Sequence, residues 1–152
     1  MISSSAESEL KDAMKFAEEN RGILSDHGFE FVSSERQQSK FVADFQMLGY
    51  HNRATGMHIM ISFFPEWENQ PSNIYPILTD HKGRKLPVED FLKKHSRADL
   101  AGQLTRGGGC TDTFEFLHAA YSALRTIMST ELRGIVSGNE WETVLFDWAG
   151  LR

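Results

Sequence analysis

The single cysteine of this 152-residue chain, Cys110, has the sequence context of a reactive thiol. It follows Arg106 and three glycines and precedes a predicted helix that begins near Asp112. The positive end of a helix dipole lowers a thiol pKa, and glycine N–H groups can hold an anion. A catalytic thiol also needs a base, and only His118 lies close by, on the polar edge of the same helix. We interpret Cys110 as an ordinary loop cysteine. A small hydrolase that uses Cys110 or a histidine is an alternative.

Histidines and paired acids are the other residues that could do chemistry. The acid pairs Glu66/Glu68 and Glu89/Asp90 could supply general acid–base catalysis. The histidines show no metal-ligand spacing such as H-x-H or H-E-x-x-H. No phosphate-binding loop, Rossmann glycine pattern, nucleophile elbow or zinc-finger spacing occurs either. The sequence thus predicts no enzyme, no metal site and no cofactor. The six histidines are His27, His51, His58, His81, His95 and His118.

Trp67 carries the strongest binding signal, because it lies between two acids in the proline-rich segment PEWENQPSN. An exposed aromatic residue ringed by acids is typical of an interface anchor, although a Trp folded back over a sheet fits the pattern too. Lys and Arg are absent from residues 54–81, 107–124 and 134–151. These stretches predict a surface for a basic protein partner, with ordinary solvated acidity as the alternative. The predicted partner-binding residues are Glu66, Trp67, Glu68, Asp80, Glu140, Glu142 and Asp147.

The elements that position these residues are organised around a β-hairpin. Apolar runs at residues 40–50 and 57–64 flank the polar segment HNRATG, which is typical of two strands joined by a long loop. Residues 29–32 predict a short strand before a polar turn, SSERQQS, and residues 74–78 predict a fourth strand. Pro76 confines that strand to a sheet edge or a bulge. In the first hairpin strand the predicted apolar face is Phe41, Ala43, Phe45 and Met47, and in the second it is Met57, Ile59, Ile61 and Phe63.

The remaining segments predict helices. A capping box at Ser4 and Glu7 starts an N-terminal helix, and Pro87 precedes a short helix that ends near His95. A further short turn or helix is expected around residues 100–104. The strongest helix runs over residues 112–133, capped by an Asp and stopped by a Gly, and its wide apolar arc makes it a core element. Asn139 caps a final helix that carries Trp141 and Trp148 on its apolar stripe.

We therefore expect one α+β domain over residues 1–152. Its sheet is a four-stranded antiparallel meander, with the N-terminal helix and the C-terminal helices packed on one face. The longest uncharged apolar run is far too short to cross a bilayer, and the first residues lack the regions of a secretory signal. With a single cysteine, this predicts a cytoplasmic protein. The net charge of −5, without a clustered basic patch, argues against nucleic acid as a partner.

Three segments together resemble a known family. They are His27-Gly28-Phe29 at the end of the first helix, the strand pair around Tyr50 and Ile59, and residues 132–138. With the order of elements, they resemble small bacterial immunity proteins of contact-dependent and polymorphic toxin systems. The resemblance implies a cytosolic protein that neutralises a cognate toxin, for example a nuclease, by occluding its basic active-site surface. It assigns no site residue. An adaptor or secretion-chaperone module is the alternative, and the oligomeric state stays open.

Overall fold

Five antiparallel strands form one sheet in the computed structural model, which describes residues 4–38, 44–110 and 112–144. They pair in sequential order: β1 (Phe29–Gln37), β2 (Phe45–Asn52), β3 (Met57–Phe64), β4 (Asn73–Thr79) and β5 (Lys85–Pro87). The predicted meander is confirmed, with one strand more than expected. β5 escaped prediction because its three residues are too few to show an alternating pattern.

The first strand is longer than predicted. The segment predicted as a turn continues β1 to Gln37, after a bulge between Phe31 and Ser33. Its polar side chains have partners on the sheet or on the first helix: Gln46 donates to Ser34 Oγ at 2.7 Å, and Arg36 forms an ion pair with Glu7 at 2.6 Å. The turn prediction was wrong because a polar edge strand has the composition of a loop.

The hairpin is confirmed, but the predicted inner face of its first strand was wrong. Leu48 and Tyr50 of β2 are buried with Gln46 and Asn52, whereas Phe45 and Met47 lie on the opposite face. The polar members of the inner face are tolerated because they are hydrogen-bonded; Asn52, for example, donates to His27 O at 3.1 Å. The predicted inner face of β3 is confirmed, and residues 41–43 lie outside the described residues.

Pro76 stands where its missing N–H is tolerated. β4 pairs with β3 along its whole length but with β5 only at residues 77–79, so the outer side of β4 is unpaired at Pro76. The predicted edge position is confirmed in this local sense.

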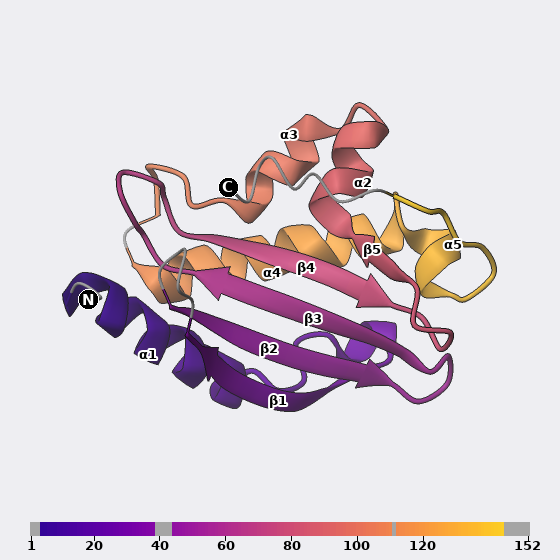
Figure 1. The fold of residues 1–152 in the computed structure, drawn as a ribbon, viewed down its shortest axis with the longest axis horizontal. Coiled ribbons are helices and arrows are strands. Elements are labelled where there is room, and N and C mark those ends of the chain that lie inside the picture. The colour runs from indigo at the N-terminus through magenta and orange to yellow at the C-terminus, as the bar shows by residue number, and fades with distance from the viewer. Residues whose placement is uncertain (1–3, 39–43, 111, 145–152) are drawn as a thin grey trace.

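The helices are arranged behind the sheet and beside its β4–β5 edge (Figure 1). The two long helices, α1 and α4, lie on one face, and α2 and α3 lie beyond the edge. Among the described residues, no helix combines the length and apolarity that a membrane span requires. The helices are α1 (Ser4–Glu19), the 3-10 turn η1 (Ser25–His27), α2 (Val88–Lys94), α3 (Ala98–Ala101), η2 (Gly102–Leu104), α4 (Thr113–Ser129) and α5 (Arg133–Val136).

The C-terminal helices differ from the prediction at their ends. Asp112 caps α4 as expected, accepting from Glu115 N at 2.8 Å. The helix ends at Ser129 instead of Arg133, where the hydroxyls of Ser129 and Thr130 bond back to carbonyls one turn earlier. Residues 139–144 are irregular, so the predicted final helix is wrong over this segment, and its continuation lies outside the described residues.

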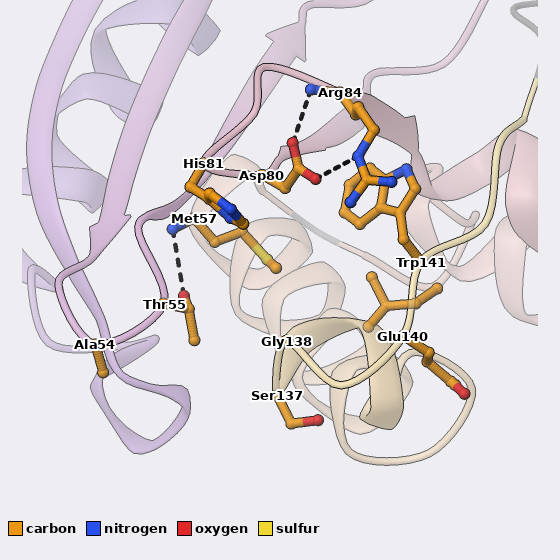
Figure 2. Close-up of a pocket in the computed structure, with 11 residues that line it drawn as sticks. Ala54, Thr55, Met57, Asp80, His81, Arg84, Ser137, Gly138, Glu140 and Trp141 are labelled. Atoms are coloured by element: carbon orange, nitrogen blue, oxygen red, sulfur yellow. Dashed lines mark hydrogen bonds and ion pairs between the residues drawn. The ribbon is translucent and has the colours of Figure 1, made fainter.

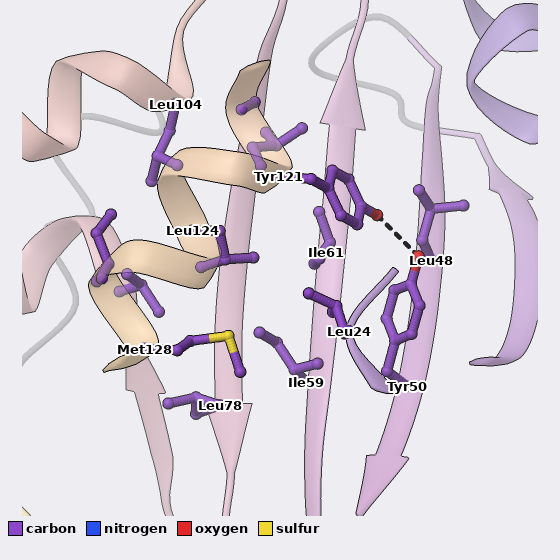
Figure 3. Packing of buried hydrophobic residues seen from close by; sticks show 14 of the residues in the cluster. Leu24, Leu48, Tyr50, Ile59, Ile61, Leu78, Leu104, Tyr121, Leu124 and Met128 are labelled. Carbon is purple, nitrogen blue, oxygen red and sulfur yellow. Dashed lines mark hydrogen bonds between the residues drawn. The ribbon is translucent and has the colours of Figure 1, made fainter. Parts of the chain in front are cut away.

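The core lies between the inner face of the sheet and α1 and α4 (Figure 3). Leu124 and Met128 of α4 point toward Ile59, Leu78 and their neighbours on the strands. Two buried tyrosines, Tyr50 and Tyr121, join their hydroxyls across this core at 3.0 Å. The prediction that the apolar arc of α4 faces the sheet is therefore confirmed.

Candidate functional site

Trp67 lies on a tight turn that links β3 to β4 and is 42% exposed. Trp67 N donates to Gln70 O at 3.1 Å, and Gln70 N donates to Trp67 O at 2.8 Å. The two residues between them, Glu68 and Asn69, have φ values of 45° and 66°. Positive φ at both central residues is the signature of the type I′ turn that closes tight hairpins. The turn was missed in the sequence because Glu-Asn replaces the usual Asn-Gly.

This turn holds Glu68 in a conformation that L-residues other than Asn and Asp rarely adopt. The left-handed region costs such a residue about 1–2 kcal/mol, and the reciprocal hydrogen bonds between Trp67 and Gln70 hold it there. Strain of this kind clusters at active sites, ligand clamps and switch regions. We call residues 66–70 the Trp67 turn.

The base of the Trp67 turn is fastened to the rest of the protein. Glu66 N donates to Glu9 Oε2 of α1 at 3.0 Å, and Arg106 Nη1 lies 3.5 Å from Glu9 Oε1. Arg106 N also donates to Ser72 O at 2.8 Å, just before β4. Glu9 is only 8% exposed, so this anchorage is shielded from water. The turn is thus tied down on both sides, while residues 66–71 remain exposed.

Asp80, another predicted binding residue, lies at the opposite end of β4 and serves its own loop. Its carboxylate accepts hydrogen bonds from Lys82 N, Arg84 N and Arg84 Nε at 3.1, 2.8 and 2.6 Å. Burial opposes ionisation, but the hydrogen bonds and charge of Arg84 outweigh it and lower the pKa of Asp80. With 6% exposure, this acid has little to offer a partner.

Glu140 lies near the same end, at a cavity of about 250 Å³ between the β2–β3 and β4–β5 loops and the segment after α5 (Figure 2). Arg84 spans the cavity rim, with its guanidinium 5.1 Å from the centre of the Trp141 ring. Asp80, His81 and Met57 also line the cavity.

Glu142 is paired with α2. His95 Nε2 lies 2.7 Å and Lys94 Nζ 3.3 Å from Glu142 Oε2. Burial by itself would raise the pKa of Glu142, but the hydrogen bonds and charges of His95 and Lys94 outweigh it and lower that pKa. Asp147 lies outside the described residues.

The predicted binding residues therefore belong to two separate places. Glu66, Trp67 and Glu68 lie before β4, whereas Asp80 follows it, and a strand of seven residues spans about 20 Å. Stretches that lack bases in sequence also meet bases in space, because Arg84 pairs with Asp80 and Lys94 pairs with Glu142.

The residues considered for catalysis are scattered. Cys110 is partly buried and packs against the core, and its carbonyl accepts from Arg106 Nη2 at 3.4 Å. His27 Nε2 lies 2.8 Å from Ser129 Oγ, and His51 stacks on His58 with ring centres 4.3 Å apart. Within the described ranges, no group of three or more His, Cys, Asp or Glu side chains could hold a metal ion.

Comparisons of the chain with family models, curated proteins and solved structures give no match.

Proposed function

We propose that this protein is a toxin-neutralising binding protein and that the Trp67 turn is its anchor on a basic partner. The observation that carries the proposal is an exposed Trp on a strained, doubly hydrogen-bonded turn. An aromatic side chain held ready for contact loses little conformational entropy on binding, and Trp is the residue most enriched among interface hot spots. A toxin as the partner follows from the resemblance of the element order to immunity proteins.

Electrostatics support a basic partner at this end of the sheet. Glu66 and Glu68 are exposed on either side of Trp67, and the nearby Arg106 is turned inward to Glu9. The acids raise the rate of encounter with a basic surface, and the desolvated indole slows dissociation. Asp80 and Glu142 already have basic partners in their own structure, so the proposed contact does not include them.

The test uses a toxin candidate encoded directly beside this protein's gene, with binding measured by surface plasmon resonance. Trp67→Ala should weaken binding by about 2 kcal/mol, or about 30-fold, mainly through faster dissociation. Met14→Ala is the matched control, because Met14 is also an exposed apolar side chain but lies on α1. Equal affinities for wild type and Trp67→Ala would place the interface elsewhere.

A charge-reversal pair tests the steering role. Glu66→Lys with Glu68→Lys should slow association, and the wild-type association rate should fall as salt is added. Glu18→Lys with Glu19→Lys, the same change on the exposed side of α1, is the control.

Co-expression with the toxin distinguishes an immunity protein from an adaptor or secretion chaperone. Wild type should restore growth and Trp67→Ala should not, whereas an adaptor would bind a partner that does not arrest growth.

A further inference from the structure

The sheet has a second face, turned away from α1 and α4, that carries apolar side chains. Figure 1 looks onto this face, and no helix of the described chain crosses it. Alternation along the strands places six large side chains there, each only partly buried, and we call this surface the open face. They are Phe45, Met47, Met60, Phe64, Tyr75 and Ile77.

The side chains of the open face pack sideways against one another. Phe45 and Phe64 are neighbours with ring centres 4.9 Å apart. Met60 lies over Gly49, its sulfur 3.4 Å from the position where a Cβ would be. Ser62, which pairs with Met47 of β2 and Tyr75 of β4, is only 7% exposed. Such lateral packing produces a continuous, shallow surface, which suits another flat sheet face better than an inserted helix or a small ligand.

The charges on the open face change sign across the sheet. One row of paired residues runs from Glu30 on β1 through His51, His58 and Thr79 to Lys85 on β5. β1 also carries Glu35 on this face, and both acids are exposed. Glu30 has an ion pair of 3.7 Å with Arg53, but both side chains are largely exposed and such a pair contributes little. The β1 margin of the face thus carries two acids, Glu30 and Glu35, and the β5 margin carries Lys85.

This polarity matches a second copy of the same chain. A two-fold axis parallel to the strands, passing over the central strand β3, places β1 of one copy over β5 of the other. Glu30 then faces Lys85 of the other copy, and the symmetry repeats the pair. Met60, on β3, meets its own counterpart close to the axis.

We propose that two copies of this protein associate through their open faces. Four residue rows about 6.8 Å apart and five strands about 4.8 Å apart make a face of roughly 20 by 19 Å. Two such faces bury roughly 760 Å², below the ~1,200 Å² of standard specific interfaces, so the dimer should be weak, with a dissociation constant no tighter than about tens of micromolar. The Trp67 turn lies beyond the ends of β3 and β4, so the dimer presents two such turns.

Sedimentation equilibrium of the full chain, from about 1 to about 500 µM, should show the mass rising from one chain to two. Met60→Glu should weaken association by about 30-fold or more, because it brings two carboxylates together in an apolar contact. Met14→Glu, the same change on α1, should leave it unchanged. If Met60→Glu proves unfolded by circular dichroism, the charge variants below decide alone.

Lys85→Glu should weaken association by about fivefold, and Glu30→Lys should act in the same direction. The double swap should restore wild-type association. Within one chain these residues are four strand spacings apart, about 19 Å, which exceeds the screening length at physiological salt. Rescue can therefore arise only between copies. A monomer at every concentration, or a dimer indifferent to Met60→Glu and to the charge swap, would overturn the proposal. Loss of toxin capture in monomeric Met60→Glu would assign the face to the toxin instead.

Discussion

The buried hydroxyl pair of Tyr50 and Tyr121 allows a quantitative test of the fold. Tyr50 lies on β2 and Tyr121 on α4, their exposures are 1% and 0%, and their oxygens are 3.0 Å apart. Replacing either residue with Phe removes one oxygen and leaves the other hydroxyl buried without this partner. A buried polar group left without a hydrogen-bonding partner costs about 1–3 kcal/mol, so each single variant should lose about 1–2 kcal/mol of unfolding free energy.

The double variant should lose less than the sum of the two. Both oxygens are then gone, the rings keep their packing, and an exchange of this kind is nearly neutral. We therefore expect a coupling energy of about 1 kcal/mol or more between the two positions. Urea unfolding followed by circular dichroism measures all four proteins. The remaining tyrosine, Tyr75, supplies the control, because it bonds to Asp90 at the sheet edge. Tyr50→Phe with Tyr75→Phe should be additive.

The pH dependence gives an independent reading of the same pair. Burial raises the pKa of Tyr50 to about 12, although its hydrogen bond to Tyr121 acts in the opposite direction, and burial raises the pKa of Tyr121 further. The unfolded chain loses these protons near pH 10, so stability should fall as pH rises above that value. Additive losses in the double variant, or single losses below about 0.3 kcal/mol, would refute the buried contact.

Three further predictions concern stability, measured by urea unfolding. Burial, with the charge of Arg125, lowers the pKa of His27, so the folded protein favours the neutral imidazole. The free energy of unfolding should therefore fall as the pH drops below about 6.5. In His27→Gln this fall should be smaller. A slope unchanged by His27→Gln would contradict this assignment. Glu9→Gln removes the charge that faces Arg106 and should cost about 1–3 kcal/mol, against less than about 0.5 for Glu19→Gln on the exposed side of α1. Leu124→Ala should cost about 2–5 kcal/mol through a cavity in the core, and a loss below about 1 would argue against its burial.

The fold was predictable where apolar periodicity is strong. α4 and β3 were placed with the correct inner faces because their buried positions are nearly all apolar. β2 was inverted because its inner face includes Gln46 and Asn52, whose hydrogen-bonding partners, Ser34 and His27 O, come from distant segments. No local sequence pattern predicts a buried amide whose hydrogen-bonding partner comes close only when the chain folds.

The candidate site was predictable only in part. Trp67 and its flanking acids could be selected from sequence, because a Trp between two acids in a proline-rich segment is typical of an interface anchor. The turn that presents it could not, since Glu68 is a poor residue for positive φ and only the hydrogen bonds between Trp67 and Gln70 define the conformation. The grouping of Trp67 with Asp80 assumed that a stretch of sequence without Lys or Arg forms a surface without Lys or Arg.

The acids at the two ends of the sheet differ in whether basic residues of the same chain already pair with them. Next to β5, the carboxylate of Asp80 is saturated by its own loop, and Glu142 faces Lys94 and His95. At the other end, the buried Glu9 pairs with Arg106, and no Lys or Arg of the described residues pairs with the exposed Glu66 and Glu68 beside Trp67. A carboxylate already compensated within its own fold adds little to long-range attraction, whereas an uncompensated one steers a basic partner. Among the described residues, the Trp67 turn therefore combines an exposed aromatic anchor with acids that have no basic partner, and the proposed function rests on that combination.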